Sequence, residues 1–146
     1  MNVGLRRLSW TGIALCFAAG CAGGLVNSLV AWFSGASGLT SALDVDIEPV
    51  LTSAWLYPRI VWGGLWGWLF LLFRSPVRPL NQGAMLSFAP SAVQLFVIFP
   101  FVAHKGMLGL DLGTLTPLFV LVFNATWGIT TAMLLRRFAM ERTLPG

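Results

Sequence analysis

The chain has 146 residues, of which 57% are hydrophobic and only 10% charged, and its mean hydropathy is +0.81. Soluble domains are roughly half apolar and a quarter charged, so this composition excludes an ordinary soluble enzyme or binding module. The formal net charge of +4 would suit a nucleic-acid-binding protein. However, the basic residues flank apolar stretches instead of forming one basic face, so we expect a lipid bilayer and no nucleic acid as the partner.

Four apolar stretches approach the roughly 20 residues that a helix needs to cross a bilayer. They cover residues 10–33, 55–73, 83–103 and 117–135. Because every backbone polar group in lipid must be paired within the protein, such stretches can cross only as helices. The sequence therefore predicts an all-α integral membrane protein. We expect one transmembrane domain over residues 1–146, with four transmembrane helices in an antiparallel helical bundle and short loops.

The first stretch has a second interpretation. Arg6 and Arg7 precede it and Cys21 lies within it, a combination also found in cleaved signal segments. The apolar sequence continues from Leu25 to Phe33, beyond any such cleavage site. We therefore predict a retained first span.

The segment between the first two spans, residues 35–54, contains three acidic residues and apolar residues at near-helical spacing. This pattern makes it a candidate for a short amphipathic helix lying on the membrane surface.

The basic residues predict the orientation of the chain in the membrane. Apart from Arg59, one basic residue, Lys105, falls at one predicted face, and seven arginines fall at the other. The face with the excess of Lys and Arg is usually cytoplasmic. We therefore expect both termini in the cytoplasm and a multi-pass protein of a bacterial-type inner membrane. The seven arginines are Arg6, Arg7, Arg74, Arg78, Arg136, Arg137 and Arg142.

Arg59 is the one charged residue within the predicted spans. If the second span began after it, only residues 60–73 would remain, which is too short to cross the membrane. An ionisable residue inside the membrane is by default a functional candidate whose partner should be named. The nearest acids in the sequence are Asp44, Asp46 and Glu48. Two interpretations stay open: a structural charge, either extended to the headgroups or ion-paired to this loop, and part of a binding site.

Three amide side chains reach a depth similar to that of Arg59, each from a different span. They are Asn27, Gln94 and Asn124. Buried amides commonly hold membrane helices together. Together with Arg59 they would also form a polar pocket that is open to the outer face. Such a pocket suits an anionic or carbonyl-bearing ligand, such as a lipid headgroup or a quinone.

Small residues at helical spacing predict close contacts between helices. Gly20 and Gly24 lie on one face of the first span, Gly63 and Gly67 form a Gly-x-x-x-Gly pair in the second, and Gly128 lies in the fourth. Small residues let membrane helices approach closely. The same pattern serves packing within one chain and a seam between identical chains.

No motif for chemistry is apparent. Cys16 and Cys21 point to different sides of one helix, and His104 has no His or Cys companion. We therefore predict no enzyme, metal site or cofactor. The function that we expect first is interaction with other membrane subunits or with itself, as an accessory subunit or an oligomeric scaffold. The alternative is a small carrier or a lipid- or quinone-binding protein that uses the pocket around Arg59.

Overall fold

The computed structural model describes residues 9–73 and 78–141. Helices make up 80% of the structure, and no strand occurs in these two ranges. The predicted all-α class is therefore confirmed. In chain order the elements are α1 (Trp10–Ala36), η1 (Ser41–Leu43), α2 (Ser53–Gly67), α3 (Leu69–Leu72), α4 (Pro79–Leu86), α5 (Phe88–Val93), η2 (Gln94–Val102), η3 (Met107–Leu112) and α6 (Thr116–Glu141).

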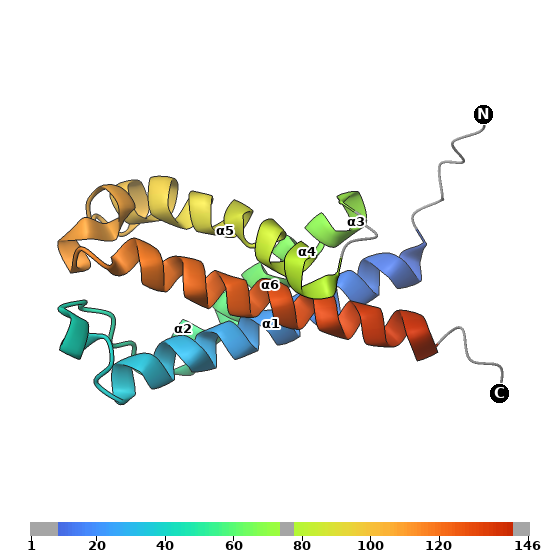
Figure 1. The fold of residues 1–146 in the computed structure, drawn as a ribbon, viewed down its shortest axis with the longest axis horizontal. Coiled ribbons are helices and arrows are strands. Elements are labelled where there is room, and N and C mark those ends of the chain that lie inside the picture. The colour runs from blue at the N-terminus through green and yellow to red at the C-terminus, as the bar shows by residue number, and fades with distance from the viewer. Residues whose placement is uncertain (1–8, 74–77, 142–146) are drawn as a thin grey trace.

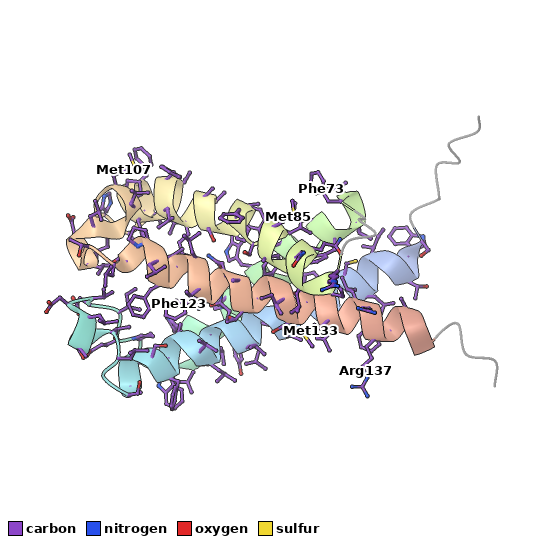
Figure 2. The ribbon with its side chains drawn as sticks, in the orientation of Figure 1. Phe73, Met85, Met107, Phe123, Met133 and Arg137 are labelled. Carbon is purple, nitrogen blue, oxygen red and sulfur yellow. The ribbon has the colours of Figure 1, made fainter. Side chains whose placement is uncertain are left out.

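Within residues 9–73 and 78–141, three helical stretches are long and apolar enough to cross a membrane: Trp10–Ala36, Pro79–Val102 and Thr116–Ala139. They contain most of the predicted spans 10–33, 83–103 and 117–135. Large apolar side chains such as Phe73 and Met107 project from the surface of the structure (Figure 2). These features indicate a multi-pass membrane protein.

The second predicted span, residues 55–73, is divided into two helices. α2 has 15 residues and extends about 22 Å at 1.5 Å per residue, which is short for a crossing. A turn at Trp68 separates it from the four residues of α3. The Trp68 backbone N–H bonds to the carbonyl of Leu65, three residues back, and so tightens the chain at this point. α2 continues through Pro58 without such a break.

Prolines explain the interruptions in the third long stretch. Pro90 has no N–H to bond with the carbonyl of Leu86, and α4 ends at Leu86 with a turn at Ser87 before α5. Beyond α5 the chain forms a π-helix, η2, which contains Pro100. A π-helix bonds each residue to the fifth one before it and is therefore wider than an α-helix.

The helices pack side by side in the order α2, α1, α6 and then α4 with α5 (Figure 1). α1 and α2 run in opposite directions. A Cβ atom on Gly20 would contact Gly63, whereas one on Gly24, later in α1, would contact Arg59, earlier in α2. The start of α1 and the end of α6 lie at the same end of the structure, and the segments 37–52 and 103–115 lie at the other (Figure 1).

Glycines hold α1 against α2. A Cβ atom on Gly63 would lie 2.7 Å from the carbonyl oxygen of Gly20 and 2.8 Å from the Cα of Gly24. A Cβ atom on Gly67 would contact the carbonyl of Cys16 and lie 3.1 Å from the Cα of Gly20. All of these neighbours are backbone atoms, so the two helices can approach this closely only where side chains are absent.

Gly128 occupies a similar position between α6 and α4. A Cβ atom placed there would meet the carbonyl of Gly83, and one on Gly83 would lie 2.7 Å from the Cα of Ile129. Gly83 was not among the predicted packing glycines. The predicted small-residue faces thus contact helices of the same chain.

Trp127 of α6 forms hydrogen bonds with both α1 and α2 where these two helices cross. Its indole Nε1–H donates to the carbonyl of Gly20 at 3.2 Å and to that of Gly63 at 3.1 Å. The side chain is 2% exposed, and its ring packs edge-on against Phe70 with centroids 6.1 Å apart. One side chain therefore connects α6 to both helices of the Gly20–Gly63 contact.

The segment 35–54 does not form the amphipathic helix considered above. Between the end of α1 and the start of α2, only Ser41–Leu43 is helical, as a single 3₁₀ turn. The hydroxyl of Thr40 donates to the carbonyl of Ile47 at 3.0 Å, and Val45 is 1% exposed. The other apolar residues, Leu39, Leu43, Val50 and Leu51, stay exposed, but no continuous helix places them on one face.

Candidate functional site

Arg59 lies in α2, about 9 Å along the helix axis from Ser53. Its Nε–H donates to the hydroxyl oxygen of Ser28 at 3.1 Å, and its Nη2 donates to Oδ1 of Asn27 at 3.0 Å. Both partners are buried residues of α1. The Ser28 hydroxyl in turn donates to the carbonyl of Gly24 at 2.7 Å, so its oxygen is left to accept from the guanidinium.

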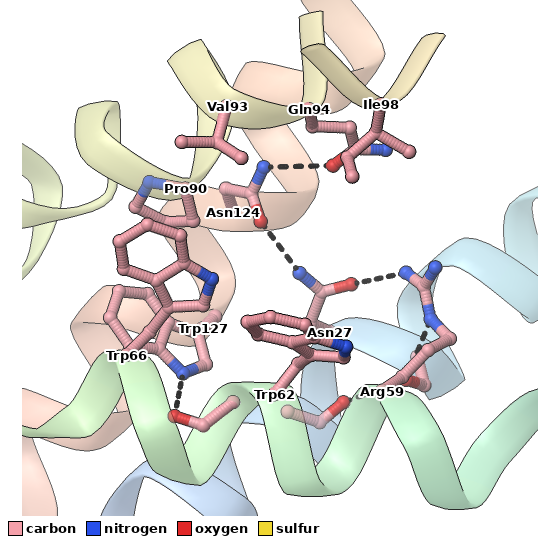
Figure 3. A pocket seen from close by; sticks show the side chains of 13 residues that line it. Asn27, Arg59, Trp62, Trp66, Pro90, Val93, Gln94, Ile98, Asn124 and Trp127 are labelled. Atoms are coloured by element: carbon pink, nitrogen blue, oxygen red, sulfur yellow. Dashed lines mark hydrogen bonds between the residues drawn. The ribbon is translucent and has the colours of Figure 1, made fainter. Parts of the chain in front are cut away.

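The hydrogen bonds continue from Asn27 across two more helices. Nδ2 of Asn27 donates to Oδ1 of Asn124 in α6 at 3.2 Å, and Nδ2 of Asn124 donates to Oε1 of Gln94 in η2 at 3.2 Å. Figure 3 shows this chain of amides running from Gln94 to Arg59. The structure thus brings together all four polar residues that the sequence proposed for a pocket.

The three proposed acidic partners of Arg59 lie elsewhere. Asp44, Asp46 and Glu48 are exposed, and no ion pair joins any of them to Arg59 in the described part of the chain. The backbone N–H of Asp46 donates to the carbonyl of Leu112 at 2.7 Å, which fixes this loop to the segment before α6. The expected ion pair is therefore replaced by hydrogen bonds to an amide and a hydroxyl.

The guanidinium retains capacity for further hydrogen bonds. It carries five N–H donors, and the bonds to Ser28 and Asn27 use two of them. The other three find no hydrogen-bond acceptor among residues 9–73 and 78–141. Its central carbon also lies 4.7 Å from the ring centroid of Trp55, a cation–π distance. Neutral groups thus surround a permanent positive charge.

A cavity of about 260 Å³ lies beside this chain of polar groups and is partly open to the surface. Trp62 and Trp66 of α2 line one side, and Pro90, Val93 and Ile98 of α5 and η2 line the other (Figure 3). α1 and α6 contribute the residues between these two sides. The cavity therefore has apolar and aromatic sides with polar groups gathered at its base, which is the usual composition of a small-molecule site.

Ser28 was not expected to contact Arg59, although the sequence contains the signal. Ser28 follows Gly24 by four residues, and Arg59 precedes Gly63 by four. In an antiparallel pair that crosses at these glycines, the two side chains fall opposite one another. Nothing in the sequence indicates that Ile98 lines the cavity, because the π-helix changes the helical period within residues 94–102.

No group of three or more His, Cys, Asp or Glu residues that could hold a metal ion occurs in the described ranges. Comparisons of the chain with protein-family models, with curated proteins and with solved structures gave no match. The cavity and its polar groups are therefore the basis for a functional proposal.

Proposed function

We propose that the protein binds an amphiphilic ligand in this cavity, with the ligand's polar head at Arg59. The observation that carries the proposal is the guanidinium beside the cavity, with three N–H groups lacking a protein acceptor in the described ranges. A positive charge removed from water without a negative partner is costly. A ligand that brings acceptor oxygens to Arg59 would offset that cost with charge-assisted hydrogen bonds.

The sides of the cavity support entry from the bilayer. Trp62 is 59% exposed and Ile98 is 38% exposed, and the two residues lie on opposite sides of the cavity. Both side chains are largely apolar, and both would gain from contact with acyl chains or an apolar tail. The ligand is accordingly a membrane component whose head enters between α2 and η2 while its tail stays among the lipids.

We propose that α2 and α3 together form a fourth crossing, with both termini in the cytoplasm of a bacterial-type cell. Residues 53–72 number 20, enough for about 30 Å. The positions of three arginines support this orientation. Arg78 lies at the start of α4, and Arg136 and Arg137 lie near the end of α6. The other arginines in the prediction, Arg6, Arg7, Arg74 and Arg142, lie outside the described residues.

Cysteine labelling in intact cells tests this orientation. Ser41→Cys, in the exposed segment between α1 and α2, is expected to react with a membrane-impermeant maleimide. Asn81→Cys, exposed in α4, is expected to react only after the cells are opened. The wild-type chain, which keeps Cys16 and Cys21, supplies the background. Equal labelling of both variants in intact cells would contradict the four-crossing topology.

Arg59→Ala is the variant that tests ligand binding. The wild-type protein, purified in mild maltoside detergent, is expected to carry a defined small molecule in native mass spectrometry. Arg59→Ala should lose nearly all of it, because charge-assisted hydrogen bonds are worth about tenfold to a hundredfold in affinity. Arg136→Ala removes an equal charge at an exposed position of α6 and should keep the ligand.

The scaffold or accessory-subunit function is our second candidate and predicts a different result in the same experiment. It needs a small-residue face left open to a partner, whereas Gly20, Gly24, Gly63, Gly67 and Gly128 pack inside the chain. A bound protein or a bare oligomer in wild type, unchanged in Arg59→Ala and without a small molecule, would favour the scaffold and overturn the binding proposal.

A further inference from the structure

We infer that the head of the ligand is a single anion that only accepts hydrogen bonds, and that it is held between Arg59 and Gln94. The inference rests on the proposed function and names the ligand class for the same cavity. Three observations carry it: the direction of the amide chain, the groups left at its two ends, and the charge of the cavity.

The direction of the amide chain is fixed by Arg59. A guanidinium only donates hydrogen bonds, so the atom of Asn27 that faces it must be the oxygen. The nitrogen of Asn27 then faces Asn124 and can only donate, which requires the oxygen of Asn124 at that contact. By the same rule the nitrogen of Asn124 meets the oxygen of Gln94. Each amide is therefore oriented by the chemistry of its neighbour.

Both ends of this chain present donors. At one end the guanidinium has three N–H groups without an acceptor in the described ranges. At the other end Nε2 of Gln94 has two N–H groups, and neither has an acceptor within these ranges. Gln94 and Arg59 both line the cavity. The oxygen of each of the three amides already accepts one bond within the chain, so the groups at its two ends that have no partner among the described residues are all donors.

The charge of the cavity selects an anion. Arg59 is the one charged residue among the described residues that line it, and the other polar side chains there are neutral amides, a hydroxyl and indoles. One negative charge on the ligand therefore balances the site. Phosphodiesters and carboxylates on an apolar tail supply that single charge together with two acceptor oxygens and no donor. Gln94 is also the first residue of a π-helix, an irregularity that is common at binding sites.

The experiment compares amphiphiles that share a twelve-carbon tail and differ only in the head. Dodecyl methyl phosphate, a phosphodiester, and dodecanoate are the anionic acceptors, dodecanol is a neutral head that both donates and accepts hydrogen bonds, and dodecyltrimethylammonium is a cation. Each is titrated into the protein in maltoside detergent, and binding is followed by native mass spectrometry. The two anions are expected to bind at least about tenfold more tightly than dodecanol, and the cation is expected not to bind. Preference between the two anions distinguishes a phosphate-bearing lipid from a fatty acid as the source.

Gln94→Met tests the second end of the site, because it removes the donors while keeping a side chain of similar length. The affinity of this variant for dodecyl methyl phosphate should fall about tenfold, the value of one hydrogen bond to a charged group. Gln94→Glu places a carboxylate there and should weaken binding by about a hundredfold. Gln82→Met is the matched control, since Nε2 of Gln82 donates to the carbonyl of Phe73 and Gln82 does not line the cavity.

The outcomes separate this inference from the function on which it rests. Binding of dodecanol or the cation as tightly as the anions would overturn the inference and leave a ligand-binding cavity. Equal binding of a decyl-substituted benzoquinone would overturn the requirement for charge. Unchanged affinity in Gln94→Met would overturn the role of Gln94. If wild type binds none of these probes and carries no small molecule, the proposed function falls as well.

Discussion

Replacing Gly63 with alanine is expected to lower the free energy of unfolding by about 3 kcal/mol, at the upper end of the cost of overpacking. The added Cβ atom would lie 2.7 Å from the carbonyl oxygen of Gly20 and 2.8 Å from the Cα of Gly24. Neither atom can move without moving α1, so the two helices must separate. The measurement is unfolding in mixed micelles by titration with SDS, followed by circular dichroism.

Gly12→Ala is the matched control for this prediction. Gly12 also lies in α1, but its added Cβ atom would meet only two side-chain atoms, Oγ of Ser9 at 3.2 Å and Cδ2 of Leu71 at 3.9 Å. Side chains can adjust, and alanine favours a helix over glycine by about 1 kcal/mol. We expect a change of less than about 1 kcal/mol in either direction. An equal loss in both variants would show that the close approach at Gly63 is not what stabilises the bundle.

Truncating Trp127 to alanine is expected to cost about 4 kcal/mol, the usual cost of removing a buried large aromatic side chain. The side chain is 2% exposed and packs against Phe70. Trp127→Phe keeps a ring and removes the indole N–H that serves Gly20 and Gly63, so it should cost about 1 to 3 kcal/mol through the buried carbonyls left without this donor. The same SDS titration measures both variants.

Trp62→Phe provides the comparison for Trp127→Phe. Trp62 is 59% exposed, and its indole makes no hydrogen bond to the described residues. Its replacement should change the free energy of unfolding by less than about 0.5 kcal/mol, as is usual for exposed positions. Comparable losses at Trp62 and Trp127 would contradict the bridging role of the Trp127 indole.

Hydropathy alone predicted the three long spans to within a few residues, because burial of apolar surface in lipid depends on local composition. The glycine spacing likewise predicted which faces of α1 and α2 allow close contact. The break at Trp68 was not predicted, since turns of this kind depend on how the end of α2 packs rather than on composition. The change of helical period in η2 was also not predicted from the sequence, although Pro90 and Pro100 show where helical hydrogen bonds must be lost.

The candidate site was predictable where it depended on depth in the membrane. Counting residues along each span placed Asn27, Gln94 and Asn124 near Arg59, and these residues are joined by hydrogen bonds. The partner of Arg59 was not predictable in this way. Proximity in sequence favoured the acidic loop, but the path of a loop depends on contacts such as that of Asp46 with Leu112, which composition does not reveal.

The amides of Asn27, Asn124 and Gln94 share one orientation, which could run in either of two directions along the chain of hydrogen bonds. Reversing Asn27 alone would set its nitrogen against an Arg59 N–H and its oxygen against the oxygen of Asn124, so both contacts would become repulsive. The amides can therefore reverse only together, and Arg59 makes one of the two states far more stable than the other. The orientation fixed at Arg59 is consequently passed from one amide to the next, across α2, α1, α6 and η2, as far as Gln94.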